Sequence, residues 1–345
     1  MKPKTVIVLV VIVAMLINLA GIFYFYTVSN QILKEQVQEH LLTAANSRAD
    51  HIQTFLDGKK GRAIDFASDG FIKDSLNALK QGGNSDQINK ALNNHLLVNK
   101  LPTDKDLYGI EILNSQGIVV GHSGEEEAEE VHKEENKFFK TVFSLGKEGI
   151  FVSDAFYDKE SKRNAIAISA PIIDEGEFLG VVIIKMGLET LADITIDRTG
   201  LGNTGEIYIL NKENLLITPS RFLGGNAGIL TQEVDTENSR ECQEDFEEYG
   251  GESVILKEHE EEEAIISYID YRGEKGIGVH AYILETRWCL LAEISESEVL
   301  GSARKQLLIV SLFILIITSV FLFLLAYFSG RFFDKKISKL RGKGE

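Results

Sequence analysis

The chain has 345 residues and a formal net charge of −16, with 44% hydrophobic and 26% charged residues. This apolar content excludes a largely disordered polypeptide and suffices for buried cores in two domains of ordinary size. The sequence has no nucleophile–base arrangement, no zinc-ligand spacing and, outside the chain ends, no basic patch. We therefore predict that the protein is not an enzyme and has no cofactor, metal site or nucleic-acid partner.

Two uncharged apolar stretches lie near the chain ends, at residues 5–28 and 306–329. A helix of about 20 apolar residues crosses the hydrocarbon core of a bilayer, so each stretch is long enough to span it. The first stretch is too long for the apolar region of a cleaved signal peptide, and no small-residue cleavage site follows it. We predict two transmembrane helices.

Basic residues flank each stretch on the side of the nearer terminus. Residues 1–4 carry two lysines, and residues 330–345 carry six basic residues against two acidic ones. Because Lys and Arg favour the cytoplasmic side, we predict that both termini are cytoplasmic and that the main domain lies outside the cytoplasmic membrane. The enclosed residues 29–306 hold 28 basic and 50 acidic residues, a net charge of −22, which is compatible with export.

After the first span, residues 29–80 are predicted to form one stalk helix. Their apolar stripe, with spacings of three and four, consists of Leu33, Val37, Leu41, Ala44, Arg48, Ile52 and Phe55. No helix breaker separates the stalk from the span, so the two form a continuous rod. The stripe packs either on its own domain or on a twin helix in a homodimer, and the sequence does not separate these alternatives.

Residues 81–190 follow as a first α+β module. A helix to about Leu101 precedes five predicted strands, at 107–113, 118–122, 149–156, 164–171 and 178–186. Between the second and third strands lies a helical insert with an acidic run, Glu125–Glu135. Five short antiparallel strands with an inserted helix describe a PAS-like sheet.

Residues 191–305 repeat this arrangement as a second module. A helix at 188–199 leads to strands at 205–210, 215–218, 264–269, 278–283 and 288–294. The predicted fold class is therefore α+β, with two tandem PAS-like modules after the stalk. Residues 296–306 are helical and enter the second span, and residues 330–345 begin a HAMP-like coupling segment.

The second module contains both cysteines, Cys242 and Cys289. In an oxidising compartment they are expected to form a disulfide that closes a loop of about 47 residues. Two buried free thiols are the alternative.

Five segments of the chain resemble the double Cache sensor family of prokaryotic chemoreceptors and histidine kinases. They are Leu107–Gly117, Gly202–Asn211, Leu216–Phe222, Tyr271–Gly273 and Trp288–Ile294. The resemblance implies a membrane-distal module that binds a small molecule, a membrane-proximal module that relays the signal, and a cytoplasmic output. That output would be a separate signalling partner or a missing C-terminal module.

The family's amino-acid receptors carry an Arg-x-Trp-Tyr cluster in the distal insert and an Asp on the last distal strand. Here the insert reads Asn136–Lys140, and Lys185 stands where the Asp is expected. The chain is therefore not expected to be an ordinary amino-acid receptor. A lysine suits an organic anion, whereas a salt bridge from Lys185 to Glu111 is the structural alternative.

Further site candidates follow from the geometry of a PAS-like sheet. The full candidate set is Tyr108, Glu111, His122, Phe139, Asp154, Tyr157 and Lys185. Each residue alone also fits a structural role. Two other motifs are discounted: Gly200–Gly205 has the helix before it and the strand after it, the reverse of a dinucleotide-binding loop, and Glu258–Glu263 lacks the ligand pattern of a calcium loop.

The sequence therefore predicts a two-span sensor that binds a small extracytoplasmic ligand and signals across the membrane. The alternative is a membrane-anchored assembly protein that uses the same scaffold without a ligand. An occupied polar pocket would favour the sensor, and a pocket filled by the protein's own side chains would favour assembly.

Overall fold

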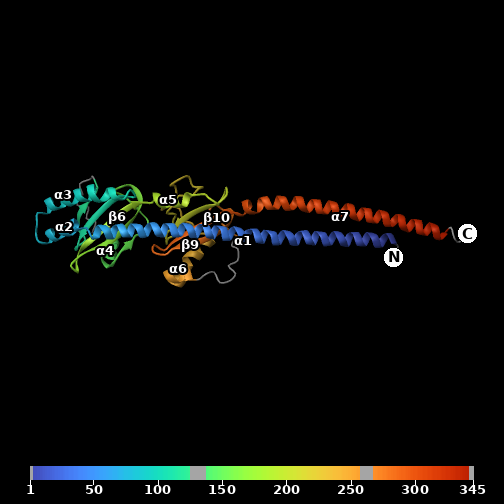
Figure 1. The fold of residues 1–345 in the computed structure, drawn as a ribbon, viewed down its shortest axis with the longest axis horizontal. Helices are drawn as coiled ribbons and strands as arrows, with labels where there is room; N and C mark the ends of the chain where they lie inside the picture. Colours follow the sequence, from blue (N-terminus) through green and yellow to red (C-terminus); the bar gives the residue numbers. More distant parts are fainter. Residues whose placement is uncertain (1–2, 125–136, 257–266, 342–345) are drawn as a thin grey trace. The chain divides into compact units, whose positions relative to one another are not determined.

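The computed structural model of the chain describes residues 3–124, 137–256 and 267–341 (Figure 1). It divides into two compact units, one made of residues 1–39 and 295–345 and the other of residues 40–294. The acidic runs Glu125–Glu135 and Glu258–Glu263 fall outside the described residues, so their predicted insert and loop roles stay predictions.

The first unit contains the apolar parts of two long helices, α1 (Pro3–Ala67) and α7 (Glu296–Arg341). Both are long and apolar enough to cross a membrane, with mean hydropathies of 2.3 and 3.1 over their most apolar windows. The predicted spans lie inside them, so the structure is consistent with two spans. Within this unit Lys34 Nζ lies 3.2 Å from Glu296 Oε1.

In the second unit α1 buries one side against its own domain. Its fully buried positions include Leu41, Ala45, Ile52, Leu56, Ala63 and Phe66. The predicted spacing of three and four therefore describes this part of the helix, and the stripe from Leu41 onward packs within a single chain.

The predicted stalk helix of residues 29–80 is interrupted. The helix ends at Ala67, and a separate helix, α2 (Gly70–Lys80), follows. Asp69 lies between them in an extended conformation, and its Oδ1 accepts a hydrogen bond from the Ile72 amide at 3.0 Å. An Asp that caps a new helix competes with continuation of the previous one, and this explains the break.

The distal module is a six-stranded antiparallel sheet with the order β2-β1-β6-β5-β3, with β4 also paired to β5. The strands are β1 (Leu107–Asn114), β2 (Val119–His122), β3 (Phe151–Val152), β4 (Phe156–Asp158), β5 (Arg163–Asp174) and β6 (Glu177–Gly187). The single strand expected at 149–156 is split at Ser153. The Ser153 amide still donates to the Ala167 carbonyl at 2.8 Å, but the Ala167 amide donates to the Ser153 hydroxyl at 2.9 Å in place of its carbonyl.

Helices cover this sheet. One face packs on α4 (Lys137–Glu148) through an apolar cluster of Leu113, Phe139, Val142, Ala167, Val181 and Ile183. At the other end of the sheet α3 (Ser85–His95) packs on β2, where a Cβ on Gly121 would lie 2.5 Å from Leu92 Cδ2. Glycine at 121 therefore lets the helix approach the strand.

The proximal module has four described strands in the order β7-β10-β9-β8. They are β7 (Glu206–Leu210), β8 (Ser267–Ile269), β9 (Lys275–Ile283) and β10 (Trp288–Ser295), preceded by α5 (Glu189–Ile196). The segment predicted as a strand at 215–218 makes only isolated bridges, such as Leu210 with Leu216. The predicted fold class is confirmed: a long N-terminal helix precedes two antiparallel sheets with their helices.

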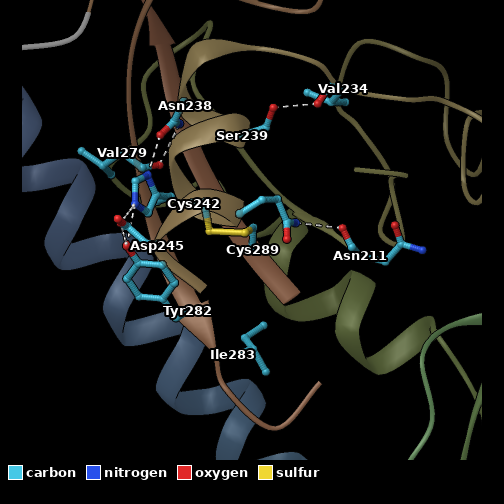
Figure 2. Close-up of a disulfide and its surroundings, with 12 residues drawn as sticks. Asn211, Val234, Asn238, Ser239, Cys242, Asp245, Val279, Tyr282, Ile283 and Cys289 are labelled. Carbon is cyan, nitrogen blue, oxygen red and sulfur yellow. Dashed lines mark hydrogen bonds and ion pairs between the residues drawn. A yellow bond between two sulfur atoms is a disulfide. The ribbon is translucent and has the colours of Figure 1, made fainter. Parts of the chain in front are cut away.

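A helix that the sequence analysis did not predict, α6 (Glu237–Leu256), packs on the proximal sheet. Thr236 and Ser239 cap its start, because each side-chain oxygen accepts a hydrogen bond from the other's amide, at 2.9 and 3.2 Å. Figure 2 shows Cys242 of this helix joined by a disulfide to Cys289 of β10. The disulfide fixes α6 to the centre of the sheet.

Candidate functional site

Three charged side chains from three strands of the distal sheet meet beside α4. The ammonium of Lys185 on β6 lies 2.8 Å from Glu111 Oε1 on β1 and 3.5 Å from Asp158 Oδ2 on β4. Lys185 is 3% exposed and Glu111 is 5% exposed, so both charges are buried. Buried charges persist only when they are paired, and these groups pair with each other.

An irregularity in β1 brings Tyr108 to the same place. The register advances two residues on β1, from Leu107 to Gly109, for one residue on β6. Such a bulge redirects side chains. The Tyr108 hydroxyl donates to Asp158 Oδ2 at 2.9 Å, and the Phe139 ring of α4 lies 5.1 Å from the Lys185 ammonium. Tyr108, Glu111, Asp158, Phe139 and Lys185 form what we call the distal cluster.

The distal cluster is negative. Glu160 Oε2 also lies 3.7 Å from Lys185 Nζ, so three carboxylates surround one ammonium. Burial lowers the pKa of Lys185, but the charge and hydrogen bond of Glu111 outweigh burial and hold this pKa above its usual value. Burial raises the pKa of Asp158, but the charge of Lys185 and the hydrogen bond from Tyr108 bring it below its usual value. Lys185 and Asp158 are therefore charged at neutral pH.

The sequence left two roles for Lys185, and the structure contains the salt bridge to Glu111. An organic anion would have to displace a carboxylate that is already in place. It would also enter a region with an excess of negative charge. The geometry therefore disfavours an anion as the ligand of this cluster.

The other predicted site residues, His122, Asp154 and Tyr157, are not in the distal cluster. His122 pairs with Glu111 across β1 and β2, so it shares the same sheet face, and its amide donates to Asn93 Oδ1 at 2.8 Å. Asp154 accepts a hydrogen bond from Trp288 Nε1 at 2.8 Å and so connects the distal module to β10. Tyr157 is 53% exposed and points away from the core.

Sequence reasoning missed Asp158. It selected Asp154 and Tyr157 from the same segment, although Asp158 lies two residues after Phe156 on β4 and so shares the inward face with it. The alternation of side chains along a strand would have favoured Asp158 over Tyr157, had the boundaries of this short strand been known.

Comparisons with known proteins agree with this architecture. The family model described as the Cache domain matches residues 29–303. The sensory domain of the Campylobacter jejuni chemoreceptor Tlp3 is 13% identical with a TM-score of 0.51, covering 79% of this chain and 98% of that one. The ligand-binding domain of Mlp24 with asparagine is 15% identical with a TM-score of 0.50, covering 78% and 98%.

A further similar structure is the extracellular domain of mmHK1S-Z2, named as a histidine kinase. It is 13% identical with a TM-score of 0.51, and the alignment covers 78% of this chain and all of that one, 100%. No curated protein matches the chain. At these identities the structural likeness establishes the fold.

Proposed function

The chain belongs to the Cache domain family, whose model covers residues 29–303, and from this we propose that it is a membrane sensor for a small extracytoplasmic molecule. Structures with the same fold are described as a chemoreceptor sensory domain, a ligand-binding domain and the extracellular domain of a histidine kinase. The two candidate spans of α1 and α7 suit a protein of the cytoplasmic membrane with both termini inside.

The observation that carries this proposal is the distal cluster. A few convergent polar groups beside an apolar surface are typical of small-molecule sites. Here buried charges from β1, β4 and β6 meet next to the Phe139 ring. Because three carboxylates surround one ammonium, we propose a ligand that carries a cationic group in place of the organic anion suggested by the sequence.

Signal relay is the second part of the proposal. Ligand binding shifts an equilibrium between two conformations by the difference in its affinity for them. The helix α1 is continuous from the apolar stretch to Ala67, so we propose that a displacement of its far part is passed along this helix. A homodimer and a cytoplasmic signalling partner complete the proposed system.

Thermal unfolding of the full chain in lipid nanodiscs tests ligand binding. A library of primary amines, organic acids, purines and phosphates is screened, and a specific ligand raises the unfolding midpoint by mass action. We expect the hits among the amines. Glu111→Gln should lose the response to such a hit, whereas Lys185→Met, which removes the competing ammonium, should keep it.

Tyr157→Phe is the matched control, because this residue lies on the neighbouring strand but is exposed. It should respond like the unaltered chain. If the hits are organic acids and depend on Lys185, the cationic class is wrong although the sensor remains. If all three variants respond equally, the distal cluster is not the binding site.

One observation favours a second function. Lys185 is already engaged by the protein's own carboxylates, as expected of a site that is filled by its own side chains. A membrane-anchored assembly protein would have such a filled site. It would give no hit in the library, and its self-association in nanodiscs would be unaffected by Lys185→Met.

A further inference from the structure

A second buried polar cluster lies on the face of the proximal sheet that bears the Cys242–Cys289 disulfide. Glu206 on β7 and Glu293 on β10 are directly opposite in the strand register. They are only 3% and 1% exposed. Side chains of such cross-strand pairs lie side by side, so two carboxylates share one buried space.

Three hydroxyl groups hold these carboxylates in place. Tyr271 donates to Glu206 Oε1 at 2.6 Å, and Ser220 donates to Glu206 Oε2 at 3.0 Å. Tyr268 donates to Glu293 Oε2 at 2.7 Å. Two of these hydroxyl oxygens also accept hydrogen bonds, Tyr268 from Asn238 Nδ2 at 3.3 Å and Ser220 from the Phe222 amide at 3.0 Å.

The backbone makes room for this arrangement at Gly278 on β9. A Cβ at this position would lie 2.2 Å from the Tyr268 hydroxyl oxygen and 3.0 Å from Asn238 Nδ2. A side chain there would prevent Tyr268 from reaching Glu293. Glycine at position 278 therefore leaves the space that the Tyr268 hydroxyl occupies.

Two polar atoms in the cluster have no hydrogen-bond partner among the described residues. They are Glu293 Oε1 and the Tyr208 hydroxyl, and the Tyr208 side chain is 0% exposed. Tyr208 lies two residues after Glu206 on β7, so its side chain is on the same face of the sheet as both glutamates. Fully buried polar atoms without partners are rare in folded proteins, so each needs an explanation.

Charge balance indicates what kind of partner is missing. Within the described parts of the chain, neither Glu206 nor Glu293 has an ion pair. Arg272 is bound to Asp270 instead, with Nε 2.9 Å from Oδ2. The cluster thus presents negative charge, acceptor oxygens and aromatic rings, since Tyr208 and Tyr271 pack edge to face with centroids 5.7 Å apart.

We propose that Glu206, Glu293, Tyr208, Tyr268 and Tyr271 form a binding site for a small primary ammonium ion. An ammonium group has three donors, which match Glu293 Oε1, the Tyr208 oxygen and the second lone pair of Glu206 Oε1. Its charge offsets that of the glutamates, and the tyrosine rings attract cations. A divalent metal fits less well, because no group of three metal-binding side chains occurs among the described residues.

This site is separate from the distal cluster and does not depend on the function proposed for it. It is tested with the full chain in phosphatidylcholine nanodiscs, with methylammonium chloride as the probe. Tetramethylammonium chloride and sodium chloride at the same ionic strength are the controls, because neither cation has an N–H donor. We expect methylammonium to raise the unfolding midpoint by about 2–5 °C at saturation and the controls to leave it unchanged.

Variants locate the effect. Tyr208→Phe removes only the unpartnered hydroxyl at constant volume and should weaken methylammonium binding at least about tenfold. Glu293→Gln should abolish it. Glu111→Gln, which removes a carboxylate of the distal cluster, should leave the shift unchanged and serves as the matched control.

Four outcomes would overturn the proposal. One is an equal shift from the control salts, and another is a shift that survives in both Tyr208→Phe and Glu293→Gln. A shift that disappears in Glu111→Gln would assign the amine to the distal cluster. No shift in the unaltered chain at any methylammonium concentration would mean that the glutamates are satisfied by a shared proton or by water alone.

Discussion

Glu293 is buried beside other negative groups, and this makes its charge state depend on pH in an unusual range. Burial, followed by the charges of Glu206 and Asp270, raises its pKa to about 8. Two further groups act on Glu293 and lower its pKa. Tyr268 donates a hydrogen bond to it, and Arg272 contributes a positive charge. Its ordinary carboxyl pKa of 4.5 applies to the unfolded chain.

We predict that folding stability falls as pH rises from about 5 to 8. In this window the folded chain holds a proton on Glu293 that the unfolded chain has lost, so raising the pH favours unfolding. The stabilisation is complete below the unfolded pKa, is lost as the pH approaches 8, and is of the order of a few kcal/mol. Unfolding midpoints measured at half-unit pH intervals test this.

Glu293→Gln should flatten the pH dependence between 5 and 8, since a neutral amide cannot titrate. Glu274→Gln is the control, because Glu274 is an exposed carboxylate on the turn between β8 and β9. A slope that survives in Glu293→Gln would assign the titration to another group. A bound ammonium ion would favour the ionised carboxylate, so saturating methylammonium should also reduce the slope.

At the scale of elements, the disulfide between α6 and β10 is the strongest single constraint on the proximal module. Cys242 and Cys289 are both fully buried, and they pack with Phe246 and Leu291 in one apolar cluster. Removing the link with Cys242→Ala and Cys289→Ala should cost about 2–4 kcal/mol, because the unfolded chain regains the freedom of a 47-residue separation. The unfolding midpoint should fall accordingly.

Thiol alkylation of the unfolded chain before and after reduction provides the check on this prediction. Labelling of both cysteines without reductant would show that the bridge is not formed. Any difference in stability between the double variant and the unaltered chain would then come only from the loss of two buried thiol groups.

Sequence patterns identified elements where apolar periodicity was strong, and they missed elements where it was weak. Strands β1 and β6 were predicted nearly in full and β5 over most of its length, because most of their buried positions are apolar. The helix α6 was missed because part of its inward side is polar: Asn238 contacts His280 at 2.9 Å, and Asp245 accepts a hydrogen bond from Tyr282 (Figure 2). A stripe of hydrogen-bonded polar residues gives no hydrophobic pattern to detect.

The same reasoning explains the candidate site. Lys185 was identified because it stands where the family resemblance places an Asp, and Glu111 because of its place on the first strand of a PAS-like sheet. Both also carry a second signal, since a charge inside an apolar strand must have a partner. Glu206 and Glu293 carry the same signal, each lying in a strand of apolar residues. They were not selected because their strands were assigned only a relay role by resemblance. Asp158 could not be placed, because strands of two or three residues have no readable period.

At the scale of the whole molecule, the proposed signal relay would need a contact between the two sheets of the second unit. Asp154, in the loop between β3 and β4, provides one through its hydrogen bond to the indole of Trp288 at the start of β10. Trp288 is fully buried. Loss of the acceptor would leave a buried N–H group without a partner, which costs about 1–3 kcal/mol.

We therefore predict that Asp154→Ala loosens the proximal sheet although the substitution lies in the distal module. Amide hydrogen exchange, followed by mass spectrometry on the full chain in nanodiscs, should be faster in β10 and α6, while β1 and β6 stay protected. Asp154→Asn is the matched control, because its amide oxygen still accepts from Trp288. Burial already raises the pKa of Asp154, so a neutral group costs little there. Faster exchange confined to the loop of residues 153–155 would mean that the two modules are held together by other contacts, and the relay would then have to pass through α1 alone.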